Sequence, residues 1–261
     1  MSRVIAIANQ KGGVGKTTSA VNLAAGLAGN GKNVLMIDLD PQASLTLCMG
    51  FREPDKLEHS VTEVITRLVN DQELPEDFGL IHINDNLALM PASIDLSAVE
   101  VSLVNAMSRE LILKGYMETV RHKYDYIIID CMPSLGILTV NALACADSVL
   151  IPVQAAYLPV KGLQQLIKTI YTVKRRLNNN LDIEGILFTM VDRRTAYAKE
   201  IVSEVNEVYG KSIPIFSIEI PISVRASETS QVAKTIYDYD PKGKAAFAYS
   251  ELTKEVLEHG C

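Results

Sequence analysis

A glycine-rich loop near the N-terminus contains the residue types that bind phosphate. It reads Lys11-Gly-Gly-Val-Gly-Lys16-Thr-Thr18 and follows the apolar run 4–8. The glycines allow a tight turn that directs consecutive backbone N–H groups inward, which makes a concave anion site. The Lys16 ammonium can reach the β- and γ-phosphates of a nucleotide, and the Thr17 hydroxyl can ligate Mg²⁺. The loop therefore predicts a nucleoside triphosphate site that uses consecutive residues, namely Gly12, Gly13, Val14, Gly15, Lys16, Thr17 and Thr18.

Three aspartates at the ends of apolar runs could handle a metal ion and a water molecule. Asp130 ends the run 124–130, and an acid in that position after a phosphate loop is the expected form of a Walker B aspartate, which holds Mg²⁺ directly or through water. Asp38 ends the run 33–38, and Asp40 follows two residues later. Asp38 could assist around the metal, and Asp40 could position or polarise a water for attack on the γ-phosphate. The alternative is that one of these two acids only caps the helix that begins near Ser44.

The elements that must position these residues alternate between strands and helices. An α/β fold is expected, a P-loop NTPase with a mostly parallel central sheet and helices on both faces, and residues 1–261 form one domain. The expected strands are 4–8, 33–38, 80–83, 87–90, 124–130, 149–153 and 184–191, with an extended segment or short strand pair over 213–221. The expected helices are 19–28, one from 44, 60–70, 96–123 with a break near Ser108, 161–177, 195–209, and a last helix with Asp240 as N-cap and Pro241 at its first position.

Composition narrows the class of protein. The 261 residues are 48% hydrophobic, which is ample for one core, and the formal net charge is −6. That charge argues against coating of nucleic acid by the whole surface but leaves room for a local basic face. The four cysteines show no CxxC spacing, no apolar run reaches 18 residues, and the N-terminus enters a strand at once. We therefore expect a cytoplasmic protein with reduced thiols.

Taken together, these motifs resemble the ParA/MinD group of deviant-Walker ATPases. Gln10 stands where the general phosphate-loop pattern has its first glycine, and Lys11 adds a second lysine. Within the group, the chain looks most like the ParA or Soj partition ATPases of chromosomes and plasmids. The motifs that carry this closer resemblance are Asp38-Leu-Asp40-Pro-Gln, Ile-Ile-Ile-Asp130-Cys-Met-Pro-Ser, Leu-Phe-Thr-Met-Val-Asp192-Arg-Arg-Thr, Ile-Pro221-Ile-Ser-Val-Arg225-Ala-Ser-Glu228 and Tyr239-Asp-Pro-Lys-Gly-Lys.

The resemblance implies an ATP- and Mg²⁺-dependent homodimer that hydrolyses ATP slowly unless it is stimulated. Lys11 would cross to the phosphates of the partner subunit, so the catalytic set is Lys11, Lys16 and Asp40. The base would be held around Met190 and Pro221. The ATP-bound dimer would bind DNA without sequence preference and associate with the nucleoid, and a ParB-like protein would stimulate hydrolysis and release the DNA.

A basic stretch supports the expected DNA contact. Between residues 161 and 199, eight basic residues face three acids, a local balance of +5. Such a patch, doubled by dimerisation, could neutralise several phosphates; the alternative is a solvated helix face. The resemblance places DNA contacts at Arg194 and Arg225, with Arg193 next. Where the family often has an arginine, this chain has Ile222, and Met132 replaces a common proline.

Three rival readings use the same scaffold. A MinD-like membrane-cycling ATPase would need a basic amphipathic C-terminal helix, but the tail 251–261 has three glutamates and one lysine, so no membrane partner is expected. An iron–sulfur or metabolic enzyme, such as a ligase, would need suitably placed cysteines; Cys131 and Cys145 lie in apolar stretches. A cargo-positioning ATPase would use the same chemistry with a different partner.

Overall fold

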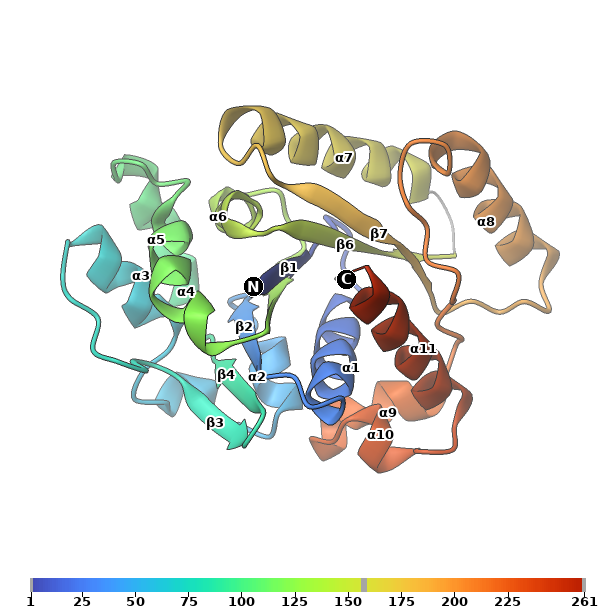
Figure 1. Cartoon of the computed structure of the whole chain (residues 1–261), viewed down its shortest axis with the longest axis horizontal. Helices are drawn as coiled ribbons and strands as arrows, with labels where there is room; N and C mark the ends of the chain where they lie inside the picture. The colour runs from blue at the N-terminus through green and yellow to red at the C-terminus, as the bar shows by residue number, and fades with distance from the viewer. Residues whose placement is uncertain (1, 156–158, 260–261) are drawn as a thin grey trace.

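The protein is built around one twisted sheet that is almost entirely parallel (Figure 1). The structure is a computed structural model that describes residues 2–155 and 159–259. Within these residues the strand order is β3-β4-β2-β5-β1-β6-β7, and only β3 and β4 pair antiparallel. The strands are β1 Arg3–Ile7, β2 Val34–Leu39, β3 Ile81–Asn84, β4 Leu87–Met90, β5 Tyr126–Cys131, β6 Ser148–Gln154 and β7 Asp182–Thr189.

Helices cover both faces of the sheet (Figure 1). One face carries α1 Lys16–Gly29, α2 Ser44–Cys48, α9 Val224–Val232, α10 Ile236–Tyr239 and α11 Lys244–Glu258. The other carries α3 Val61–Val69, α4 Leu96–Ser102, α5 Ile112–Val120, α6 Ile137–Cys145, α7 Pro159–Arg176 and α8 Ala196–Tyr209. Short 3₁₀ turns lie at Pro54–Lys56, Leu103–Asn105 and Arg121–Lys123. The predicted fold class is confirmed.

The central strands are apolar on both sides because both faces are covered. In β1, Val4 and Ala6 join the core under α5–α7, whereas Ile5 and Ile7 join the core under α1 and α11. Successive side chains point to opposite faces of a strand. An acid at the end of such a strand is therefore assigned to one face by its register, and this decides where the aspartates point.

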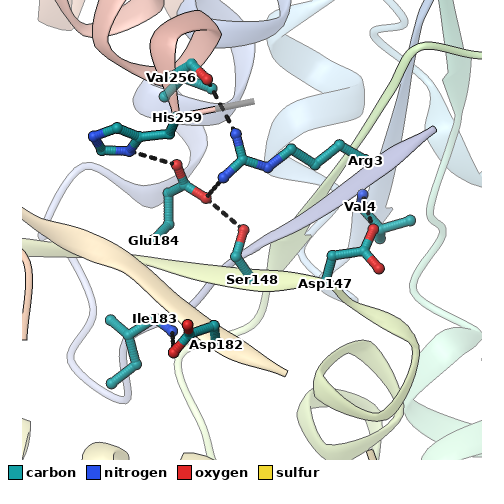
Figure 2. A network of polar contacts seen from close by, with 9 residues as sticks. All are labelled: Arg3, Val4, Asp147, Ser148, Asp182, Ile183, Glu184, Val256 and His259. Carbon is teal, nitrogen blue, oxygen red and sulfur yellow. Dashed lines mark hydrogen bonds and ion pairs between the residues drawn. The ribbon is translucent and has the colours of Figure 1, made fainter. Parts of the chain in front are cut away.

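A polar network links α11 to the sheet at the edge where the parallel strands begin (Figure 2). The Glu184 carboxylate of β7 is fully buried and accepts hydrogen bonds from Arg3 at 2.5 Å and from Ser148 at 2.6 Å. Its other oxygen lies 3.0 Å from Nδ1 of His259, which follows α11. Arg3 also donates to the Val256 carbonyl at 3.0 Å. A buried carboxylate with these partners holds β1, β6, β7 and α11 in register.

Several predicted boundaries hold because local chemistry sets them. Ser60 and Glu63 form the capping box of α3, and Thr195 caps α8 through the Ala198 N–H. The predicted helix over 96–123 breaks around Ser108, whose φ is 49°. Segment 213–221 is extended, joined to the sheet only by isolated bridges at Ile186↔Ile215 and Val191↔Pro221 within the described residues.

The predicted start of the last helix is wrong. Asp240 and Pro241 lie in a turn, and α11 begins at Lys244 with Gly243 as its cap. The side chain of Asp240 instead sits against Gly243, where an added Cβ would lie 2.0 Å from its Oδ2. Helices α9 and α10 were also missed, although Ser223 and Thr235 cap them through the N–H groups three residues on. These two caps were readable signals.

Candidate nucleotide-binding site

The glycine loop joins β1 to α1 at the carboxyl edge of the sheet, where ligands bind in open parallel folds. Gly13 and Gly15 have φ of 71° and 83°, a left-handed conformation that other residues adopt only with strain. The Lys16 ammonium donates to the Lys11 carbonyl at 3.1 Å, so the loop folds over its own lysine. Lys11, Gly12 and Gly13 are exposed. The loop thus has the backbone shape that the sequence predicted.

The end of β7 and the residues that follow it contact the loop from one side. Thr189 donates from its hydroxyl to the Val14 carbonyl at 2.8 Å. A Cβ added at Gly15 would lie 4.0 Å from Cε of Met190, and Met190 itself has a φ of 50°. The bridge between Val191 and Pro221 brings the other predicted base contact to the same corner. The structure therefore places Met190 beside the loop and Pro221 opposite Val191, and the base site around them stays a prediction.

Thr17 and Asp130 meet at the position expected for a metal ion. The Thr17 hydroxyl donates to Oδ2 of Asp130 at 2.7 Å, while Oδ1 of Asp130 is buried and hydrogen-bonds to none of the described residues. Burial, and next the charge of Asp38, raises the pKa of Asp130 to about 8; the Thr17 hydrogen bond and the Lys16 charge oppose this shift. A hard divalent cation accepts hydroxyl and carboxylate oxygens. The Thr17–Asp130 pair, with its unused oxygen, fits Mg²⁺.

Asp38 points to the same side as Asp130 because the two residues are register partners in β2 and β5. Its carboxylate is already occupied, since Oδ2 accepts from the Thr46 N–H at 2.8 Å and the Thr46 hydroxyl at 2.7 Å. Oδ1 accepts from the Asp40 N–H at 3.3 Å. Burial raises the pKa of Asp38 to about 6, and the Thr46 hydrogen bonds lower it. This geometry favours the alternative that Asp38 caps the helix after it, α2.

Asp40 and Lys16 complete the charged part of the site. Asp40 is half-buried, and its Oδ1 accepts from the Gln42 N–H at 2.9 Å. Lys16 is 7% exposed; burial lowers the pKa of its ammonium, and the charges of Asp130 and Asp40 act in the opposite direction. A lysine held under carboxylates in this way is a preorganised cation for phosphate oxygens. Lys16, Asp40, Asp130 and Thr17 are therefore brought together.

Two residues of the site, Asn9 and Thr46, were not predicted from the sequence. Asn9 is buried; its amide donates to the Pro152 carbonyl at 2.7 Å and its Oδ1 accepts from the Lys11 N–H at 3.0 Å. Thr46 fixes Asp38, as described above, and also receives the Ala92 N–H at 3.1 Å. An asparagine directly after a buried strand, and a threonine in the first turn of a helix, are the patterns that point to such positioning roles.

The three predicted DNA-contacting arginines are exposed and each is paired with an acid. Arg193 lies 2.6 Å from Glu219, Arg194 makes a two-point contact with Asp192 at 2.8 and 2.6 Å, and Arg225 lies 3.4 Å from Glu228. Hydrogen bonds from Arg194 lower the pKa of Asp192 to about 2. The Arg225 guanidinium also lies 5.5 Å from the centre of the Tyr239 ring. The arginines are therefore held in place but partly neutralised.

The expected basic patch over 161–199 is not one patch. Lys174, near the end of α7, lies 3.5 Å from Asp182, the first residue of β7, whereas Arg193 and Arg194 follow the last residue of that strand. Eight residues of strand span roughly 25 Å, so the two groups lie at opposite edges of the sheet (Figure 1). The Lys161 side chain lies outside the described residues. The basic residues at the end of α7 are a solvated helix face.

The cysteines in the described part of the chain give no sign of a metal or redox centre. Cys131 and Cys145 are buried; burial raises the pKa of both thiols, that of Cys145 to about 12. No group of three or more metal-ligating side chains occurs among residues 2–155 and 159–259. None of the described helices is long and apolar enough to cross a membrane.

Comparison with known proteins gives consistent matches over the whole chain. The model of the AAA domain family matches residues 2–183. The chain is 44% identical over 260 residues to the sporulation initiation inhibitor protein Soj of Bacillus subtilis, covering 100% of both. It is also 44% identical to the chromosome partitioning protein ParA of Myxococcus xanthus, covering 99% of this chain and 89% of that protein. The crystal structure of cobyrinic acid a,c-diamide synthase from Mycobacterium smegmatis with bound ATP analog and magnesium superposes with a TM-score of 0.86 at 35% identity, covering 100% and 96%.

Proposed function

Because the chain belongs to the AAA domain family and, within it, to the Soj/ParA chromosome-partitioning ATPases, we propose that it is an ATP- and Mg²⁺-dependent dimerising switch for DNA partition. In the ATP state the dimer binds DNA without sequence preference. Hydrolysis, stimulated by a ParB-like protein, returns it to monomers. The observation that carries the proposal is the buried Thr17–Asp130 pair beside Lys16, with one carboxylate oxygen left for a cation.

The residues of the site divide the chemistry between them. The backbone N–H groups of the glycine loop and the Lys16 ammonium bind the phosphate oxygens, and Thr17 and Asp130 hold Mg²⁺. The cation neutralises charge that develops on the β- and γ-phosphates. Asp40 lies close enough to interact electrostatically with Lys16 and Asp130, and it orients the water that attacks the γ-phosphate. Asp38 keeps β2 and α2 in register so that Asp40 faces the site.

Dimerisation would bring a second lysine, Lys11, to the phosphates of each bound nucleotide. Lys11 is exposed on the loop, and a Cβ added at Gly12 or Gly13 would meet no described atom within 4 Å. This open side has room for the loop of a second copy. Lys11 would then reach the phosphates of the partner subunit and act as an arginine finger does elsewhere. The monomer hydrolyses ATP slowly because the charge of the partner's Lys11 is missing.

The proposed DNA surface uses the three arginines that follow β7 and open α9. Arg193, Arg194 and Arg225 are exposed, and a dimer would present each of them twice. Contacts of this kind bind phosphate without reading sequence, so affinity should fall steeply with salt. Nucleoid association would follow from the same contacts.

The test is Lys16→Ala, measured by light scattering and by binding to a random-sequence duplex with no nucleotide, with ADP and with ATP. We expect wild-type protein to dimerise and bind DNA only with ATP, and the variant to do neither. Lys32→Ala, a half-buried lysine after α1 and outside the predicted site, is the matched control and should behave as wild type. ATP-dependent dimers of the Lys16 variant would refute the loop assignment.

A ligase on the same scaffold is the alternative that the similarity to the diamide synthase brings forward. It predicts ATP consumption that depends on an acceptor carboxylate and an amide donor. Incubation with cobyrinic acid, glutamine and ATP decides between the two. Hydrolysis that these compounds leave unchanged, but that DNA and a ParB-like protein increase, supports the partition switch.

A further inference from the structure

A groove outside the phosphate loop runs between the start of α11 and the extended segment 217–221. It has a volume of about 550 Å³, within the range of ligand clefts, and is open to solvent. The side chains that matter for the argument are Arg193, Glu219, Pro221, Lys242, Lys244 and Phe247. No residue of the loop 10–18 lines it. The groove therefore lies apart from the phosphate loop, although Pro221, one of the predicted base contacts, also lines it.

The groove carries net positive charge. Three cations, Arg193, Lys242 and Lys244, line it together with one carboxylate, Glu219. Glu219 is taken by Arg193 at 2.6 Å. Lys242 and Lys244 are exposed and form no ion pair with any residue of the described part of the chain. Two unpaired ammonium groups at the rim of a groove are suited to an anionic polymer rather than to a neutral ligand.

An exposed aromatic ring lines the same groove as these cations. Phe247 is 64% exposed, although its neighbours Ala246 and Ala248 are buried at 3% and 2%. It therefore lies on the side of α11 turned away from the core. Leaving a phenyl ring in water forfeits roughly 2 kcal/mol of burial. Packing of α11 does not require a ring at this position, so the exposed face is available to a ligand.

We propose that this groove binds single-stranded nucleic acid, with an unpaired base stacked on the Phe247 ring and neighbouring phosphates on Lys242 and Lys244. Base stacking on aromatic side chains combined with a cationic groove is the general physical basis of single-strand binding. In a duplex the faces of the bases are covered by their neighbours, so only an unpaired base offers a face to the ring. The proposal rests on the proposed DNA function and extends it from duplex phosphates to an unpaired base.

The experiment measures the anisotropy of a fluorescent oligothymidine of about 15 nucleotides and, in parallel, of a random-sequence duplex. Full-length wild-type protein is compared with Phe247→Leu, which keeps the apolar bulk but loses the ring, and with Phe247→Trp, which keeps a ring. We expect Phe247→Leu to weaken single-strand binding about tenfold and Phe247→Trp to retain it. Duplex binding should change much less. Tyr171→Leu, an exposed ring on α7, is the matched control and should leave both unchanged.

The cations are tested by salt dependence. Changing Lys242 and Lys244 together to Gln should reduce the slope of log K against log salt by about 1.4 for the single strand, about 0.7 for each phosphate that is no longer neutralised. Wild-type protein that binds duplex but not oligothymidine overturns this proposal and leaves the partition switch intact. Phe247→Leu that binds oligothymidine as wild type also overturns it. A loss confined to ATP affinity, measured with a fluorescent ATP analogue, would assign the ring to the nucleotide instead. Wild-type protein that does not bind the duplex in the presence of ATP argues against the partition switch.

Discussion

Asp130 makes the stability of the nucleotide-free protein depend on pH in a direction opposite to that of most acids. Its pKa is about 8 in the folded protein and near 3.8, the ordinary value of an aspartate, in the unfolded chain. Between these two values the folded state holds a proton that the unfolded state has released. Raising the pH across this window therefore favours unfolding. Replacing Asp130 by Asn removes the effect, because the amide does not ionise.

The magnitude follows from the two pKa values. Each pH unit inside the window changes the free energy of unfolding by about 1.4 kcal/mol for a single titrating group. From pH 5 to pH 8 the wild-type protein should lose on the order of 4 kcal/mol relative to Asp130→Asn. Asp38, with a pKa of about 6, adds a smaller loss below pH 6. Because its charge also raises the pKa of Asp130, the comparison measures the two acids together.

The assay is urea unfolding at pH 5, 6, 7 and 8, without nucleotide, of wild type, Asp130→Asn and Asp95→Asn. Asp95 is exposed and makes no capping hydrogen bond, so its variant should follow wild type at every pH. We also expect Mg²⁺ with ATP to stabilise wild type but not Asp130→Asn. A difference between wild type and Asp130→Asn that stays constant from pH 5 to pH 8 would refute the reasoning.

Three further outcomes test other parts of the structure. Asp40→Ala should slow ATP hydrolysis at least tenfold while leaving ATP binding, because it removes the group that orients the water; normal turnover in a phosphate-release assay would contradict that role. Asp192→Asn should strengthen duplex binding severalfold, because it frees Arg194 and removes a negative charge beside the phosphates; weaker binding would mean that the acid orients the arginine instead. Glu184→Gln should lower the free energy of unfolding by about 3 kcal/mol, because the half-buried Arg3 loses its fully buried counter-charge. The exposed pair formed by Glu251 is the control, and Glu251→Gln should cost less than 1 kcal/mol.

Local signals were enough for the backbone of the glycine loop, the strands of the sheet and the caps of α3 and α8, whereas α9 and α10 were not predicted. Gly13 and Gly15 adopt the left-handed conformation that their residue type allows, and Ser60 and Thr195 cap helices with their own side chains. The strand ending in Asp130 was predictable because a buried parallel strand is a continuous apolar run. In each case the residues that make the structure are neighbours in the sequence.

The roles of Asp38 and of the basic residues needed tertiary structure. Asp38 and Asp130 both end apolar strands and point to the same face, yet Thr46 occupies one carboxylate while the other keeps a free oxygen. Lys174 and Arg193 belong to one basic stretch, but α7 and β7 carry them to opposite edges of the sheet. The Asp240-Pro241 signal was overridden in the same way, because α10 and the turn before α11 use those residues.

The sequence by itself determined the chemistry that this protein can perform, because the phosphate loop and the strand-end acids work through residue type and short spacing. Tertiary structure alone decided which acid is left for a cation, that Arg193 is paired with Glu219, and that Phe247 is exposed in a groove with unpaired lysines. Thr17 and Asp130 are 113 residues apart and Arg193 and Glu219 are 26 apart, and contacts over such separations leave no mark on the local sequence pattern.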